Sequence, residues 1–392
     1  MHDPMPLDGV IVADFSRVLA GPLAASTLAD LGADVIKVER AGLGDDTRRW
    51  GPPWTENSTS YFESANRGKR SVAFDLDDPA DLRRAQQLAA RADVLIENFL
   101  PGTLTRFGLD YESLQPANPG LIYASVTGFG GGPGARLPGY DFLIQAQGGL
   151  MDITGPVGEP AKVGVAIVDV LAAKDLATAV LAALYERGRS GRGQRVEIAL
   201  LTSLQAALVN QASALHATGS TPRSLGNRHP SIAPYETVKT GEGALALAVG
   251  NDAQFARLCA VLGAPGLSAD PRFATNGQRV AHRDALIDEL ERRLQADSAS
   301  AWADRLMDAG VPAGTIGTVA DGFALAERLG LSPVVEVDGG TAQTRSPLRL
   351  SRTPITEYRR PPHLDEHGEE IRRWLDADIA AGDPEGETHG IP

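Results

Sequence analysis

Short runs of apolar residues alternate with helical patterns through the first half of the chain. The runs at 9–15 and 34–39 predict buried strands, and residues 23–31 between them have helical spacing that Gly32 ends. Two strands joined by so short a helical crossover pair in parallel. The same alternation predicts further strands at 71–76, 93–98 and 121–126 and a helix at 79–92. We therefore predict an α/β fold with a mostly parallel sheet.

The pattern changes after a glycine-rich segment at 128–140. Two apolar helices are predicted at about 170–187 and 200–218, with a strand at 194–199 between them. The strands predicted at 235–239 and 244–249 flank Thr-Gly-Glu-Gly, which is a hairpin signal, and three amphipathic helices follow across 251–310. The predicted organisation is a large domain over 1–200, a linker helix and loop over 201–234, a smaller α+β domain over 235–328, and a return to the large domain with a C-terminal tail over 329–392.

The composition argues against several classes of function and partner. The 392-residue chain has a formal net charge of −13, which argues against a nucleic-acid partner because phosphate backbones attract a basic face. The single cysteine permits neither an intrachain disulfide nor a thiolate metal cluster. No apolar run reaches membrane-spanning length, and the first residues lack the blocks of a signal peptide. We expect a cytoplasmic protein without a membrane partner.

Common cofactor and metal motifs are absent from the sequence. The turn after the first strand has no G-x-G-x-x-G, so a nicotinamide enzyme is disfavoured, and no Walker A, HExxH, CxxC or GxSxG occurs. The seven histidines are scattered. We expect no metal site and no permanently bound cofactor.

Asp169 is the most informative candidate residue. It lies among small and apolar residues just before the helix predicted at 170–187. A carboxylate there either caps the helix or serves as a nucleophile at the edge of a pocket, and the position alone does not decide between them. Arg40 and Arg106 follow predicted strands, where α/β sheets bind ligands, so both are candidates for a phosphate site.

Several blocks together resemble the class III CoA-transferases, also called the CaiB/BaiF family. The block LGADVIKVER at 31–40 is one of them, and NRGKRS at 66–71 is another. The remaining blocks lie, in the family's order, at 6–15, 20–22, 92–99, 101–102 and 190–194. The resemblance covers nearly the whole chain.

The resemblance implies a fold and a set of site residues. The fold is a Rossmann-like large domain that binds CoA, plus a smaller domain, in an interlocked homodimer whose chains thread through each other. Asp169 matches the family's nucleophile. Arg40, Asn98, Phe99 and Arg106 match positions that contact CoA, and Phe74 lies near the adenine end. The substrates are an acyl-CoA thioester and a free carboxylic acid, and the reaction passes through an aspartyl mixed anhydride.

Two alternatives to a transferase stay open. The family fold also serves α-methylacyl-CoA racemases, which resemble Gly-His-Asp where this chain has Tyr140 before Asp141. A racemase requires two acid/base groups, and a phenol is a poor base at neutral pH, so Tyr140 favours the transferase. Asp141 is the open question, since it can substitute as the base. The second alternative is a CoA-binding protein without catalysis, against which Asp169 argues.

Two departures concern the acid substrate. Leu19 replaces a glutamine of the formyl-CoA enzymes, and the four-glycine loop of those enzymes has no counterpart, so formate and oxalate specificity is not expected. Arg228, in the segment 226–231, is a candidate for binding the acceptor carboxylate, and a purely structural loop arginine is an equal alternative. Tyr140 is a further candidate substrate contact.

Overall fold

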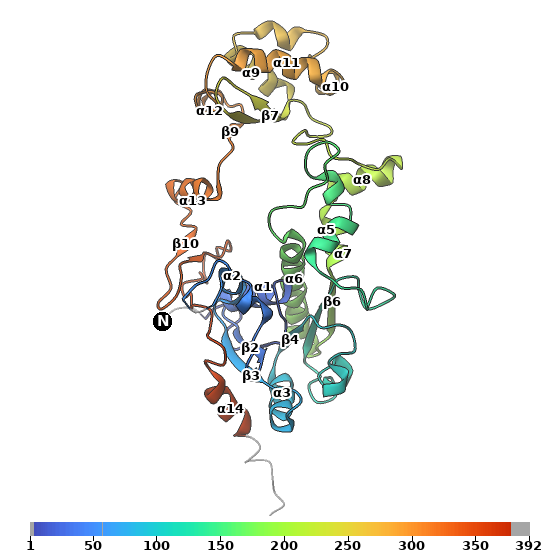
Figure 1. The fold of residues 1–392 in the computed structure, drawn as a ribbon, viewed down its shortest axis with the longest axis vertical. Coiled ribbons are helices and arrows are strands. Elements are labelled where there is room, and N and C mark those ends of the chain that lie inside the picture. Colours follow the sequence, from blue (N-terminus) through green and yellow to red (C-terminus); the bar gives the residue numbers. More distant parts are fainter. Residues whose placement is uncertain (1–3, 57, 378–392) are drawn as a thin grey trace, which may run out of the picture. The chain divides into compact units, whose positions relative to one another are not determined.

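The computed structural model describes residues 4–56 and 58–377, and the chain divides into two compact units (Figure 1). One unit comprises Met1–Gly148, Val163–Thr218 and Ser332–Pro392, and the other comprises Gly149–Lys162 and Gly219–Leu331. Residues 201–218, which the sequence assigns to a linker, thus group with the first unit, whereas 149–162 group with the second. The end of the predicted tail, residues 378–392, lies outside the described residues.

The first unit is built on a six-stranded sheet in the order β3-β2-β1-β4-β5-β6, and every neighbouring pair is parallel. The mostly parallel sheet predicted from the sequence is confirmed, and its order is that of a dinucleotide-binding fold. The strands are β1 (Ile11–Asp14), β2 (Asp34–Arg40), β3 (Arg70–Phe74), β4 (Val94–Glu97), β5 (Ile122–Thr127) and β6 (Arg195–Ala199).

Helices cover the sheet because its strands are apolar on both faces. Ala85 and Leu88 of one helix and Ile371 and Leu375 of another are buried in one core cluster with strand residues such as Ile36. The helices of this unit are α1 (Ala20–Asp30), α2 (Ser60–Asn66), α3 (Pro79–Arg91), α4 (Tyr111–Leu114), α5 (Asp141–Gln147), α6 (Ile167–Ser190), α7 (Leu200–Ala207), α8 (Val209–Thr218) and α14 (Gly368–Asp376), with 3₁₀ turns η1 (Asp46–Arg49) and η2 (Thr105–Phe107). A two-stranded ladder joins β10 (Val334–Val335) and β11 (Gln343–Thr344).

Two helix predictions need correction. The single helix predicted over 200–218 is two helices, α7 and α8, because the backbone of Val209 has a φ of 41° that an α-helix cannot accommodate. The helix predicted from about 170 begins at Ile167, which moves Asp169 inside its first turn.

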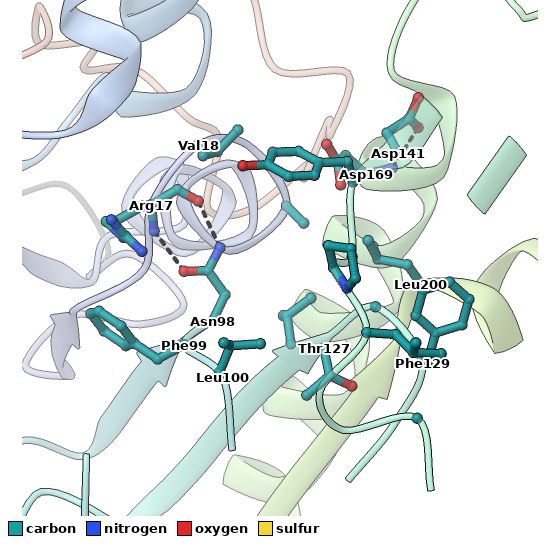
Figure 2. Close-up of a pocket in the computed structure, with 18 of the residues that line it drawn as sticks. Arg17, Val18, Asn98, Phe99, Leu100, Thr127, Phe129, Asp141, Asp169 and Leu200 are labelled. Atoms are coloured by element: carbon teal, nitrogen blue, oxygen red, sulfur yellow. Dashed lines mark hydrogen bonds between the residues drawn. The ribbon is translucent and has the colours of Figure 1, made fainter. Parts of the chain in front are cut away.

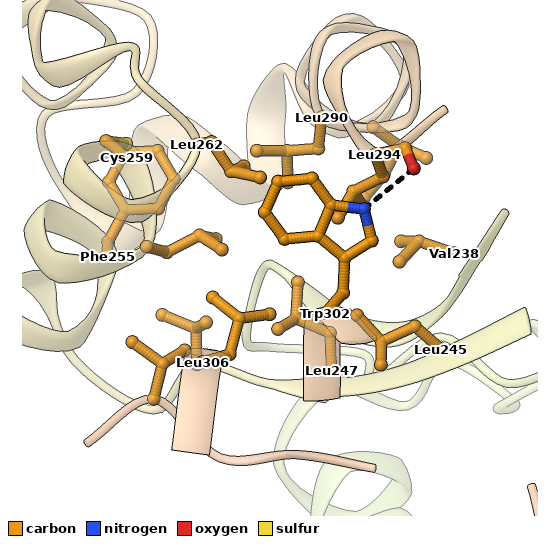
Figure 3. Packing of buried hydrophobic residues seen from close by; sticks show 14 of the residues in the cluster. Val238, Leu245, Leu247, Phe255, Cys259, Leu262, Leu290, Leu294, Trp302 and Leu306 are labelled. Carbon is orange, nitrogen blue, oxygen red and sulfur yellow. Dashed lines mark hydrogen bonds between the residues drawn. The ribbon is translucent and has the colours of Figure 1, made fainter. Parts of the chain in front are cut away.

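The second unit has its own sheet and core (Figure 3). The strands β7 (Tyr235–Lys239), β8 (Ala244–Ala248) and β9 (Ala313–Thr315) form an antiparallel sheet, and the predicted hairpin between the first two is confirmed. Trp302 is buried among leucines of this core, and its Nε1 donates to the carbonyl of Leu294 at 2.9 Å. The helices are α9 (Asp252–Val261), α10 (Asn276–Ala281), α11 (Arg283–Leu294), α12 (Ala299–Asp308) and α13 (Val319–Arg328), with 3₁₀ turns η3 (Met151–Ile153) and η4 (Pro265–Ala269). Four α-helices, and not the predicted three, therefore fill 251–310.

Two features are absent from the described part of the chain. None of its helices combines the length and the apolar character that crossing a membrane requires. Nor do its histidines, cysteines and acidic residues form a group of three or more that could hold a metal ion.

Candidate functional site

The order of the sheet reverses between β1 and β4, so the loops after these two strands begin side by side. Open α/β sheets bind ligands in the crevice outside the carboxyl ends of the strands at such a point. A cavity of about 350 Å³ lies here, within the first unit. Its lining includes Arg17, Asn98, Phe99, Tyr140, Asp141 and Asp169, of which four were predicted as site residues from the sequence.

Asp169 lies in the first turn of α6 and does not cap it. The helix begins at Ile167, and the residue before it, Ala166, has no side chain that can accept from the free amides. Asp141 accepts from them instead, because its Oδ1 receives the amide of Val168 at 2.7 Å and that of Asp169 at 3.3 Å. Figure 2 shows Asp141 beside Asp169. The capping interpretation of Asp169 is therefore wrong.

The Asp169 carboxylate is poorly stabilised by its surroundings. Burial raises its pKa to about 7, and the negative charge of Asp141 contributes to the increase. Among the described residues, none donates a hydrogen bond to this carboxylate. Its oxygens therefore remain available to an incoming group in the cavity, and the carboxylate is ionised above about pH 7.

Asp141 accepts three hydrogen bonds. Besides the two α6 amides on Oδ1, its Oδ2 accepts from Nε2 of the buried Gln145 at 2.7 Å. The Oε1 of Gln145 in turn accepts the amide of Val163 at 2.9 Å. The two α5 side chains thus hold the segment that leads into Asp169.

The loop after β1 is held in an unusual conformation. Asn98 clamps Arg17 from both sides, since its Oδ1 accepts the Arg17 amide at 2.8 Å and its Nδ2 donates to the Arg17 carbonyl at 2.7 Å (Figure 2). The next residue, Val18, has a φ of 70°, which is rare for a β-branched side chain, and its amide points to Asp45 Oδ2 at 3.3 Å. The side-chain amide of Asn98 is thus occupied in shaping the cavity wall.

Buried charges lie beneath this loop. Lys37 Nζ donates to the carbonyl of Ser16 and to Asp45 Oδ2, each at 3.0 Å, and both charged side chains are inaccessible to solvent. Lys69 Nζ meets Asp14 Oδ2 at 2.8 Å, and burial lowers the pKa of Lys69 to about 8. Removing one partner of such a pair typically costs about 3–5 kcal/mol, so the network fixes the loop firmly.

A second cavity, of about 370 Å³, adjoins the first. Arg40, Phe74 and Arg106, all predicted from the sequence, line it together. Arg17 and Phe99 line both cavities, and the Arg17 guanidinium lies 5.1 Å from the centre of the Phe99 ring. The two cavities therefore meet at this pair, with the basic side chains on one side and Asp169 on the other.

Two aromatic residues near Asp169 were not predicted as site residues from the sequence. Trp50 lines the first cavity, and its ring lies edge-on to Tyr61 with 5.4 Å between centroids. Burial raises the pKa of Tyr61 to about 12, and the charges of Asp169 and Asp141 contribute, so the phenol stays protonated. Both residues lie more than a hundred positions before Asp169 in the chain, and only the fold brings them near it.

The glycine-rich segment at 128–140 is pinched at its base. Gly128 and Gly139 approach so closely that a Cβ on either would collide with the backbone of the other. The Gly128 carbonyl accepts the amide of Leu201 at 3.1 Å, which ties this base to α7. The pinched base and these bonds make the segment a tight loop with a defined wall on the cavity.

Arg228 lies in the second unit. Its guanidinium pairs with Glu236 at 3.4 Å and with Asp284 at 3.1 Å. Both ion pairs fit the structural interpretation of this arginine, whereas its role as a substrate contact stays a prediction.

Comparison with known proteins decides the family. The model of CoA-transferase family III matches residues 7–368. The chain belongs to CoA-transferase family III. As a member, it is a CoA-transferase that acts on an acyl-CoA and an acid.

Individual relatives agree with this assignment. The chain is 44% identical to a succinate–glutarate CoA-transferase of Agrobacterium fabrum, over 95% of this chain and 96% of that one. It is 39% identical to an acetyl-CoA:oxalate CoA-transferase of Acetobacter aceti, with 94% and 95% covered. A crystal structure of a CaiB/BaiF family protein from Brucella suis superposes with a TM-score of 0.86 at 45% identity, over 95% of this chain and all of that one.

Proposed function

We propose that Asp169 is the nucleophile of a CoA transfer that passes through an aspartyl mixed anhydride. An Asp169 oxygen attacks the thioester carbonyl, the C–S bond breaks, and CoA leaves as the thiolate. The thiolate then attacks the aspartyl carbonyl, which forms an aspartyl–CoA thioester and releases the donor acid. The acceptor carboxylate reverses these two steps, and the carboxylate of Asp169 is restored. No oxidant, reductant or net proton is consumed.

The observation that carries this proposal is the state of the Asp169 carboxylate. It faces a cavity, receives no hydrogen bond from a described residue, and has a pKa of about 7 because of burial. A nucleophile in these surroundings is about half ionised at pH 7 and is not masked by donors from the described residues. Tyr61, whose high pKa keeps it protonated, and the free amides at the start of α1 are donors suited to the oxyanions that form.

CoA is proposed to span the two adjoining cavities. Its phosphates lie near Arg40 and Arg106, its adenine near Phe74, and its thioester reaches Asp169 past Arg17 and Phe99. The supporting observation is that the cavities meet at this pair, which leaves one continuous path from the basic side chains to the carboxylate. A local basic cluster suffices on a chain of net charge −13.

The acid substrate is proposed to be a short dicarboxylic acid. The names of the relatives support this class, since they include succinate, glutarate, oxalate and mesaconate. The leucine at position 19, where the formyl-CoA enzymes have a glutamine, speaks against formate and oxalate and leaves open which longer dicarboxylate the protein uses.

Neither alternative function has comparable support. A racemase requires a second acid/base group, and Asp141 is occupied by three donors. A CoA-binding protein without catalysis gives no reason for a buried carboxylate that no described residue stabilises.

We also propose that two copies interlock as a homodimer. The helices α8 and α13 contain no buried residue, and Val209, Val319 and Leu329 on or next to them are 66%, 81% and 65% exposed. A second copy of the chain would cover these exposed apolar side chains. Sedimentation analysis at micromolar concentration should show only dimer, and an active monomer would contradict the proposal.

The test of the mechanism is intact-protein mass spectrometry after incubation with succinyl-CoA. Wild type should gain the mass of CoA less water, or of the succinyl group, and should exchange CoA with added glutarate. Asp169→Ala should show neither, while Asp175→Ala, an exposed carboxylate on the same helix, should show both. Turnover by Asp169→Ala would refute the nucleophile. Rapid α-deuterium incorporation into (R)-2-methylacyl-CoA in deuterium oxide, without CoA transfer, would favour the racemase.

A further inference from the structure

The first cavity contains one arginine, Arg136, that has no partner in the described part of the chain. Among the described residues that line it, only Arg17 and Arg136 carry a positive charge. Arg17 Nη1 contacts Asp46 Oδ2 at 3.3 Å, and its guanidinium stacks against Phe99. Within the described part of the chain, Arg136 makes no side-chain hydrogen bond, ion pair or ring contact. Its guanidinium therefore has all five donors available to a ligand.

The described carboxylates that line the cavity also differ in whether they have a partner. Asp46 contacts Arg17 and Arg49, both at 3.3 Å, and Asp141 is bound by two amides and Gln145. Asp169 alone lacks a donor among the described residues. As far as the described residues show, the cavity therefore presents one uncompensated carboxylate, at Asp169, and one uncompensated guanidinium, at Arg136.

The loop that carries Arg136 is preorganised. The backbone amide of Ala135 donates to the carbonyl of Gly132 at 3.0 Å, and that of Leu137 donates to the carbonyl of Gly134 at 2.9 Å, so both neighbours of Arg136 are fixed. The contact between Gly128 and Gly139 closes the loop at its base. Little backbone entropy remains to be lost when the arginine binds a ligand.

We propose that Arg136 binds the second carboxylate of a dicarboxylic substrate while the first reacts at Asp169. This inference rests on the proposed function, since it assigns the two ends of the acid to the two uncompensated charges. A guanidinium matches a carboxylate with two parallel hydrogen bonds, which a lysine cannot do. Arg136 thereby selects dicarboxylates over monocarboxylates and also offsets the repulsion that an anionic acid meets near Asp169.

The test compares two acceptors of equal carbon number, glutarate and pentanoate, at saturating succinyl-CoA. The measured quantity is the ratio of kcat/KM for glutarate to kcat/KM for pentanoate, in which any effect on the donor cancels. Wild type should favour glutarate strongly. Arg136→Gln should lower the ratio about tenfold to hundredfold, because a charge-assisted contact is lost. Arg136→Lys should recover part of the ratio.

A matched control is Arg83→Gln, which removes an exposed arginine of α3 that does not line the cavity and should keep the wild-type ratio. An unchanged ratio in Arg136→Gln, with both rates lowered equally or not at all, overturns the inference. A wild-type ratio near one also overturns it and leaves the proposed transfer standing. Failure of wild type to transfer CoA to either acid would instead reject the proposed function, and this inference with it.

Discussion

Replacing Asp141 with asparagine should shift the pH dependence of CoA transfer toward lower pH. The reactive form of Asp169 is the carboxylate, so kcat/KM should rise with pH through the pKa of this residue in the free enzyme, about 7. The negative charge of Asp141 opposes ionisation of Asp169. Without that charge the carboxylate forms more easily, the pKa of Asp169 falls, and activity persists to lower pH.

The size of the effect follows from the two causes of the raised pKa. Burial is the larger cause of the rise from 3.8 to about 7, and Asp141 the smaller, so its charge accounts for less than half. We therefore expect the pH at which kcat/KM rises to fall by roughly one unit, which corresponds to about 1.4 kcal/mol. At pH 6 the ionised fraction of Asp169 would increase from about a tenth to about a half, or roughly fivefold.

Asparagine is the appropriate substitution because it preserves the helix cap. Its side-chain oxygen can still accept the Val168 amide, as asparagine does at many helix starts. The assay is kcat/KM for the acyl-CoA between pH 5 and 9, normalised to the plateau. Asp175→Asn removes an exposed carboxylate from α6, the helix of Asp169, and should not change the pH at which kcat/KM rises. If kcat/KM of Asp141→Asn still rises near pH 7, or rises at a higher pH, the electrostatic reasoning is refuted.

The remaining predictions concern Asp169, the second cavity and the loop clamp. Asp169→Asn should raise the free energy of unfolding by about 1–3 kcal/mol more at pH 8 than at pH 5, as measured by calorimetry, because a raised folded-state pKa makes the ionised group destabilising above pH 7; equal increases at both pH values would contradict this. Arg40→Gln with Arg106→Gln should weaken CoA binding at least about tenfold and reduce its salt dependence in titration calorimetry; unchanged affinity would reject the phosphate site. Asn98→Ala, which loses two hydrogen bonds to Arg17, should cost about 1–3 kcal/mol in denaturant unfolding; a smaller cost would mean that the clamp is dispensable.

The sheet can be predicted from the sequence because each of its strands is marked by residues close together in the chain. Each strand is a short apolar run, so the six strands of the sheet and the helices α1, α3 and α6 are predicted with errors of only a few residues. The short helices α2, α4 and α5 were not predicted. The break between α7 and α8 had no such signal. The residues there are Leu208 and Val209, and neither glycine nor proline marks the change in backbone direction.

The candidate site was predictable only in part. Asp169, Arg40 and Arg106 were found because they follow strands or begin a helix. The cap of α6 was missed because its donor and acceptor lie 27 residues apart, so no local motif could identify Asp141 as the cap. Arg136 was not singled out from the sequence, because no local motif marks it and its importance depends on the cavity that it lines.

The distribution of partners around the cavity explains why one residue is left to react. Asp46 is neutralised by arginines, Asp141 is bound by backbone amides and by Gln145, and the Asn98 side chain is occupied by the Arg17 backbone. These residues set geometry and have little capacity for a second role. A reaction that needs two acid/base groups on opposite faces of a substrate finds only one unmasked carboxylate among the described residues that line this cavity. Nucleophilic exchange needs one, and Asp169, left without a described donor in a buried position, meets that requirement.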